Sequence, residues 1–151
     1  MKRYRYQYIP GPCAQYALIN GLAVLGIKIS VAEAYRLTGV SVLRSLKEGT
    51  DTKYIVKAIR KTDCIPHTVY RQHEVSAKRA IDRLLAKGMP IIISVDQSSH
   101  WAVLASKTKD DRYRWIDSYD TRLVGYWKWV SVAEWMYDDE DGYCFIGIDS
   151  P

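Results

Sequence analysis

The sequence predicts an α+β fold, with helices first along the chain and an antiparallel β-sheet after them. Before Gly88, apolar side chains recur every three to four residues, which is the spacing of one face of a helix. After Gly88, β-branched runs and alternating aromatic residues replace that spacing, and short charged stretches separate them. This order is typical of an α+β protein, and it leaves room for a cleft between the helical half and the sheet.

The helices are expected in the first part of the chain. The first carries an apolar stripe from Ala17 to Leu25 and ends at Gly26. A capping box from Ser30 to Glu33 opens the second, because serine and glutamate at this spacing satisfy the first free N–H groups of a helix. The expected helices span residues 14–25, 30–37, 52–61 and 76–87.

Strands are expected after residue 88. Residues 90–95 form a continuous apolar run, which suits a strand that is buried on both faces. A second capping box, from Ser131 to Glu134, predicts one short helix before the last strand. Residues 2–6 alternate cations and rings, and we expect an edge strand protected by charge there. The other expected strands span residues 101–106, 112–117 and 143–148.

Composition indicates one globular domain over residues 1–151. The chain is 48% apolar and 26% charged, with a formal net charge of +5. The mild excess of basic residues permits contact with nucleic acid, but it serves solubility equally well, so a nucleic-acid partner is not expected. No apolar run approaches the roughly 18–20 residues of a membrane span, and the basic N-terminus lacks the apolar stretch of a signal peptide. We therefore expect a cytoplasmic protein, with its oligomeric state left open.

The three cysteines predict neither a disulfide framework nor a zinc site, because their number is odd and no CxxC pair is present. Cys64 and Cys144 lie beside apolar residues and are expected to be inert. His67 and His73 follow Cys64 at a spacing that matches no usual tetrahedral set. No metal and no cofactor are expected.

Cys13 differs from the other two cysteines because it opens the first helix, directly after Pro12. Free N–H groups and the positive end of the helix dipole favour a thiolate there. His100 lies in the loop between two expected strands, and Asp117 ends the strand that follows. Adjacent antiparallel strands bring these two residues together, so the carboxylate can hold the imidazole, although Asp120 competes for this role. The three residue types form a nucleophile, a base and an orienting group.

The ordered set of these residues resembles papain-like cysteine peptidases of the bacteriocin-processing, double-glycine type. Members of that family carry a glutamine six residues before the cysteine, and a helix that ends in Leu-Gly-Ile. The similarity covers about residues 7–120. The matching segments are Gln7, Cys13 to Leu22, Leu25-Gly26-Ile27, Gly49-Thr50, Gly88 to Ile92, Ser99 to Leu104, and Trp115-Ile116-Asp117.

The resemblance implies a role for each matching residue. Cys13 would attack an acyl carbon, His100 would transfer the proton, and Asp117 would orient His100. Gln7, together with the backbone N–H of Cys13, would form the oxyanion hole, and Trp101 would shield the site from water. The implied function is a thiol-dependent peptidase or amide hydrolase that acts on a peptide or protein substrate.

Two positions depart from the family pattern. Ala14 follows the cysteine where glycine is common, and Ser118 follows the acidic residue where proline is usual. No transporter segment follows, which predicts a free-standing form whose preference for a double-glycine leader is not given. Two alternatives stay open: a papain-like acyltransferase, and a non-catalytic papain-like module that binds a peptide in the same cleft.

Overall fold

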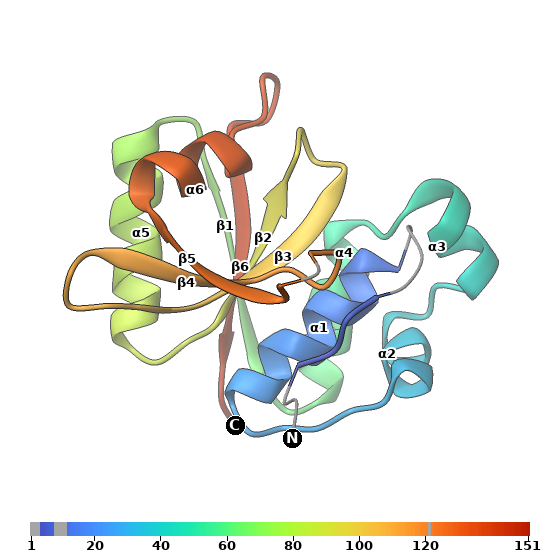
Figure 1. Cartoon of the computed structure of the whole chain (residues 1–151). Helices are drawn as coiled ribbons and strands as arrows, with labels where there is room; N and C mark the ends of the chain where they lie inside the picture. Colours follow the sequence, from blue (N-terminus) through green and yellow to red (C-terminus); the bar gives the residue numbers. More distant parts are fainter. Residues whose placement is uncertain (1–3, 8–11, 121) are drawn as a thin grey trace.

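A computed structural model of the chain describes residues 4–7, 12–120 and 122–151 (Figure 1). The described strands form a six-stranded sheet in the order β1-β6-β2-β3-β4-β5, and every neighbouring pair is antiparallel. The helices are α1 (Cys13–Val24), α2 (Val31–Thr38), α3 (Val42–Glu48), α4 (Thr52–Lys61), α5 (Glu74–Ala86) and α6 (Trp129–Met136). The strands are β1 (Ile65–Arg71), β2 (Ile91–Val95), β3 (His100–Lys107), β4 (Arg112–Ile116), β5 (Val124–Lys128) and β6 (Tyr143–Asp149).

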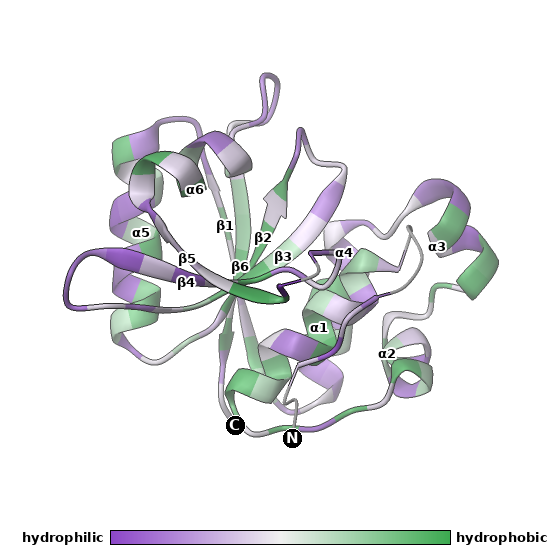
Figure 2. Ribbon diagram, in the orientation of Figure 1, coloured by the Kyte–Doolittle hydropathy of each residue, from purple (hydrophilic) through white to green (hydrophobic). Residues whose placement is uncertain are grey.

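The sheet lies between two groups of helices. Helices α1, α2 and α4 share one hydrophobic core with the sheet, while α5 and α6 share a second core with its other face (Figure 1). Figure 2 shows hydrophobic residues on the central strands between these groups. The α+β prediction is confirmed, but the helices do not form a separate half: the prediction missed β1, which lies between α4 and α5, and also α3 and β5.

Strand β2 illustrates why the sheet is buried on both faces. Ile92 faces the core of α1, whereas Ile91 and Ile93 face the core of α5 and α6. All five residues of β2 are buried, as the continuous apolar run predicted. The strand before the His100 loop is therefore fixed from both sides.

Helix α1 is the central helix of the first core, with ten of its residues buried. Gly21 permits this position, because a Cβ atom there would lie 3.0 Å from Cδ1 of Ile148 on β6. The second helix also agrees with its prediction: the Ser30 hydroxyl accepts a hydrogen bond from the Glu33 N–H, and Gly39 ends α2 in the left-handed conformation at φ 71°. The Ser30 capping box therefore determines where α2 begins, and Gly39 determines where it ends.

The prediction for α6 was wrong at its start. Ser131 lies inside the helix, and Lys128 takes the N-cap position without a side-chain hydrogen bond. The chain passes directly from β5 into α6, and Trp129 at the helix start is held by tertiary contacts. Its ring lies 5.5 Å from that of Tyr113, and its indole N–H donates to Glu74. Tertiary packing of an aromatic residue here outweighs the local capping signal.

The N-terminal edge strand is also not present in the described part of the chain. Residues 4–7 lie outside the sheet, and residues 2 and 3 fall outside the described residues. The backbone of Arg5 instead pairs with the side chain of Asn20 on α1: its N–H donates to Oδ1 over 2.8 Å, and its carbonyl accepts from Nδ2 over 3.2 Å. The Asn20 amide thus makes the two backbone hydrogen bonds that a neighbouring strand would make, and it joins residues 4–7 to α1.

Strands β3 and β4 pair from Val103 with Ile116 to Lys107 with Tyr113. His100 begins β3, and Asp117 directly follows the last residue of β4. The antiparallel register therefore places both residues at the same end of the strand pair, as their positions in the sequence predicted.

We predict that Gly125→Ala destabilises the fold. The added Cβ atom would overlap the indole ring of Trp115, which also packs against Trp127 and Trp135. Overpacking of this kind costs about 1–3 kcal/mol of unfolding free energy, measurable by urea denaturation.

Tyr126→Phe is the control, because Tyr126 lies on the same strand and is half exposed. It is expected to change stability by less than about 0.5 kcal/mol. Equal stability of the Gly125→Ala variant and the wild type would contradict the packing argument.

Candidate active site

Cys13 occupies the first position of α1, where the sequence predicted it. Pro12 is the N-cap residue, and no acidic side chain lies in the first turn of the helix. Cys13 is 7% exposed and lies at the positive end of the helix dipole. Helix geometry thus favours negative charge on the sulfur.

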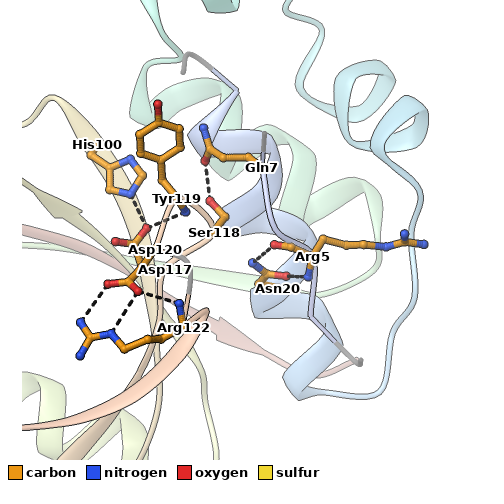
Figure 3. A network of polar contacts seen from close by, with 9 residues as sticks. All are labelled: Arg5, Gln7, Asn20, His100, Asp117, Ser118, Tyr119, Asp120 and Arg122. Carbon is orange, nitrogen blue, oxygen red and sulfur yellow. Dashed lines mark hydrogen bonds and ion pairs between the residues drawn. The ribbon is translucent and has the colours of Figure 1, made fainter. Parts of the chain in front are cut away.

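His100 and Asp117 form a short, mostly buried contact. Nε2 of His100 lies 2.7 Å from Oδ1 of Asp117, and the two side chains are 14% and 16% exposed (Figure 3). The same carboxylate oxygen accepts the backbone N–H of Tyr119 at 3.0 Å, which fixes the rotation of the Asp117 side chain. His100 also forms a hydrogen bond with Cys13. Because Nε2 contacts Asp117, Nδ1 is the ring nitrogen left for Cys13.

The surroundings of His100 favour its charged form. Burial lowers the pKa of His100, but hydrogen bonds with Asp117 and Cys13, together with their charges, outweigh it and raise the pKa to about 9. At neutral pH the ring is therefore an imidazolium. An imidazolium beside a cysteine stabilises the thiolate.

Asp120, the other carboxylate considered from the sequence, has a different partner. Its Oδ1 accepts the backbone N–H of Arg122 at 2.8 Å, and its Oδ2 pairs with the Arg122 guanidinium at 3.0 Å. Arg122 holds the pKa of Asp120 below its usual value. The structure therefore places Asp117, and not Asp120, against the imidazole (Figure 3).

Gln7 is 1% exposed and is joined to Ser118 by two hydrogen bonds. Its backbone N–H donates to the Ser118 carbonyl over 2.7 Å, and the Ser118 hydroxyl donates to its side-chain Oε1 over 2.5 Å (Figure 3). Ser118 directly follows Asp117 in the chain. Ser118 therefore connects the two residues: it is hydrogen-bonded to Gln7, proposed for the oxyanion hole, and covalently joined to Asp117, proposed to orient the imidazole.

All four predicted site residues line one cavity of about 630 Å³. This volume lies within the range of pockets that hold small molecules or short peptide segments. The walls come from the Gln7 segment, α1, α3 and its connection to α4, the loop between β2 and β3, the turn after β4, and β6. The predicted residues in its lining are Gln7, Cys13, His100 and Asp117.

Trp101 forms part of the cavity wall and is hydrogen-bonded to the connection between α3 and α4. Its indole N–H donates to the backbone carbonyl of Thr50 at 3.2 Å, and its side chain is 9% exposed. The Thr50 hydroxyl accepts in turn from Nε2 of Gln15 on α1 at 3.0 Å. The connection between α3 and α4 is thereby tied both to the helix of Cys13 and to the strand of His100.

Cys144 lines the same cavity from β6 but has different surroundings from Cys13. Burial raises the pKa of the Cys144 thiol, and hydrogen bonds with Tyr70 and Thr52 offset only part of this effect. Cys64 is buried in the first core. Among the described residues, no group of three or more histidine, cysteine or acidic side chains is arranged to hold a metal ion.

No protein family matches the sequence, and no curated protein is similar to it at a significant level. Solved structures do match. The peptidase domain of Streptococcus ComA, a bifunctional ABC transporter of a quorum-sensing pathway, superposes with a TM-score of 0.71 over 97% of both chains at 16% identity. A double-glycine-motif protease from an AMS/PCAT transporter, solved with its leader peptide, gives a TM-score of 0.70 at 18% identity and covers 97% of this chain and 91% of that one.

A third structure, the peptidase domain of Streptococcus mutans ComA, has a TM-score of 0.61 at 15% identity and covers 99% of this chain and 100% of that one. The chain therefore has the fold of these peptidase domains, as the resemblance in sequence implied. None of the helices in the described residues is both long and apolar enough to span a membrane.

Sequence reasoning missed two residues that hold the site together. Asn20 was seen only as part of the helix motif, although a fully buried amide in the middle of a helix needs partners. Ser118 was seen only as a departure from the family pattern. Its hydroxyl was the available signal, since a serine in place of proline adds a hydrogen-bond donor next to Asp117, a candidate site residue.

We predict that iodoacetamide alkylates Cys13 much faster than Cys144 at about pH 6. The imidazolium of His100 stabilises the thiolate of Cys13, whereas burial raises the pKa of Cys144. Peptide mapping after timed alkylation measures both rates in one sample. Similar rates at the two cysteines would contradict this electrostatic argument.

Asp117→Asn and Asp120→Asn form a matched pair for the same measurement. Loss of the Asp117 carboxylate removes an interaction that raises the pKa of His100, so Cys13 should react several-fold more slowly at about pH 6. Asp120→Asn is expected to leave that rate unchanged, because Asp120 pairs with Arg122. An equal effect of both substitutions would show that Asp117 has no special role.

We also predict a stability contribution from His100 that depends on pH. The pKa of histidine is about 6.5 in unfolded chains and about 9 for folded His100, so the folded state binds the proton more tightly. The contribution is therefore complete below about pH 6.5 and is lost as the pH rises through about 9. Urea denaturation should show that the stability difference between the wild type and His100→Gln shrinks over this range. A difference that grows with pH would be inconsistent with the raised pKa.

Proposed function

We propose that this protein is a thiol-dependent peptidase or amide hydrolase, with Cys13 as nucleophile, His100 as acid and base, and Asp117 as the residue that orients His100. The observation that supports this most strongly is the 2.7 Å contact between Nε2 of His100 and Asp117, which leaves the other ring nitrogen for Cys13 at the start of α1. All three side chains line one cavity. The fold shared with double-glycine peptidase domains supports the same chemistry.

The reaction begins with the Cys13 thiolate. Its sulfur attacks the carbonyl carbon of a peptide bond, and the electron pair of the C=O bond moves to oxygen. As the C–N bond breaks, Nδ1 of His100 gives its proton to the departing amine, which leaves an acyl group on Cys13. Water then attacks this thioester while His100 accepts a water proton. Collapse of the second intermediate releases the carboxylic acid and restores the thiolate and the imidazolium.

The negative oxygen of each intermediate needs hydrogen-bond donors. The backbone N–H of Cys13, at the first position of α1, belongs to the group that lacks a carbonyl partner within the helix. The side-chain amide of Gln7 supplies a second donor from the segment that Ser118 and Asn20 anchor. Removing one such donor lowers kcat by roughly 10²–10³ in other enzymes.

A peptide is the substrate class that we propose. One of the similar structures was solved with a leader peptide, and that protein is described as a double-glycine-motif protease. The cavity continues from Cys13 along the connection between α3 and α4, which gives room for residues on one side of the scissile bond. Peptides that end in Gly-Gly before a fluorogenic aminocoumarin are therefore the first substrates to test, next to a pool of unrelated fluorogenic peptides.

We predict that Cys13→Ala abolishes hydrolysis of whichever fluorogenic peptide the wild type cleaves, while the unfolding free energy stays within about 1 kcal/mol of the wild type.

The wild-type kcat/KM should fall on the alkaline side with an apparent pKa near the value of about 9 for His100, because the departing amine needs its proton. Initial rates between about pH 5 and pH 10 measure this profile.

Cys144→Ala is the matched control, since Cys144 lines the same cavity and is expected to be dispensable for hydrolysis. Persistent turnover by the Cys13→Ala variant would overturn the proposed mechanism. If the wild type bound peptides but left them intact, the chain would instead be a peptide-binding module. Mass spectrometry of the products distinguishes hydrolysis from transfer of the acyl group to an added amine.

A further inference from the structure

We propose that Ser118 is a positioning residue that holds the side-chain amide of Gln7 in the orientation an oxyanion hole requires. This inference rests on the proposed function and adds a residue to it. The observation that carries it is the pair of hydrogen bonds between the two residues: Gln7 N–H to the Ser118 carbonyl at 2.7 Å, and the Ser118 hydroxyl to Oε1 of Gln7.

The direction of the second bond matters because a glutamine amide has two unlike ends. One end is a carbonyl oxygen that accepts, and the other is an NH2 group that donates. The Ser118 hydroxyl donates to the oxygen, so the amide nitrogen lies on the side away from Ser118 (Figure 3). Gln7 is also one of the residues that line the cavity. A flipped amide would present its oxygen instead and would repel a negative oxygen on the substrate.

Burial makes the flipped orientation unfavourable. Ser118 and Gln7 are each 1% exposed. Within the described residues, Oε1 of Gln7 is the acceptor found for the Ser118 hydroxyl. If the amide flipped, the hydroxyl could accept a hydrogen bond from its NH2 group, but its own hydrogen would lose that acceptor. A buried O–H without a partner costs free energy, so Ser118 selects one orientation of Gln7.

The backbone around Gln7 is fixed independently of this hydroxyl. Asn20 holds Arg5 through two hydrogen bonds, and the Ser118 carbonyl holds the N–H of Gln7. Removing only the hydroxyl therefore leaves these backbone hydrogen bonds in place and removes one restraint on the rotation of the amide. Ser118→Ala makes that change, and Ser118→Thr restores a hydroxyl at the same position.

The experiment is a double-mutant cycle between Ser118→Ala and Gln7→Ala, measured with the Gly-Gly aminocoumarin peptide. We expect Ser118→Ala alone to lower kcat about tenfold while KM stays within about twofold, because the interaction forms in the transition state. In the Gln7→Ala background the same substitution should change kcat by less than about twofold, since its target is gone. Ser118→Thr should recover most of the lost kcat.

Two further readouts separate positioning from a general loss of structure. The alkylation rate of Cys13 at about pH 6 should not change in Ser118→Ala, because the thiolate and imidazolium do not depend on the Gln7 amide. Affinity for the corresponding peptide aldehyde should fall about tenfold, because its adduct with Cys13 carries the tetrahedral oxygen. Ser106→Ala, a serine on β3 outside the cavity, serves as the control variant and should match the wild type in all assays.

Each outcome bears on a different claim. An unchanged kcat in Ser118→Ala, or an equal loss with and without Gln7, would overturn the positioning role while Cys13-dependent turnover of the wild type remained intact. A fall in Cys13 alkylation would show that Ser118 acts through its neighbour Asp117 and would likewise overturn it. Absence of Cys13-dependent turnover in the wild type would overturn the proposed function and this inference together.

Discussion

The contact between His100 and Asp117 depends on the pairing of two strands, and the rest of the site depends on that contact. His100 begins β3 and Asp117 follows β4, so their side chains meet only because the antiparallel register brings these ends together. Both strands lie within a sheet whose two faces are covered by helices, which limits their movement. The sheet thereby supplies a fixed imidazole with a pKa of about 9, and a charged partner for any thiolate nearby.

Helix α1 brings the remaining components to that imidazole. Its first residue is Cys13, and its buried face carries two amide side chains where an ordinary core helix would carry apolar ones. Gln15 holds the connection between α3 and α4 through Thr50, and Asn20 holds the segment that carries Gln7. A buried polar atom without a partner is destabilising, so the hydrogen bonds of Nε2 of Gln15 and of the Asn20 amide stabilise these contacts. One helix therefore positions Cys13, the proposed nucleophile, and two walls of the cavity.

The sequence predicted what depends on local pattern and missed what depends on tertiary contacts. The capping box at Ser30 and the buried run of β2 were confirmed, because the local pattern of side chains agrees with the tertiary packing at both places. The start of α6 was wrong because Trp129 packs on Tyr113, a contact between distant residues. The choice between Asp117 and Asp120 stayed open in the sequence, since both follow β4. Only the backbone turn, with Arg122 held by Asp120, separates the two carboxylates.

The position after Asp117 holds a serine where proline is usual in the resembling family. Proline stiffens the backbone but cannot donate a hydrogen bond. Serine gives up that stiffness, yet its carbonyl still accepts from Gln7 and its hydroxyl adds a second bond to the same residue. Serine at this position therefore loses the fixed backbone angle of proline, but its hydroxyl restrains the side chain of Gln7. The chain shares its fold with the similar peptidase domains at 15–18% identity, and these two hydrogen bonds are how it holds Gln7 within that fold.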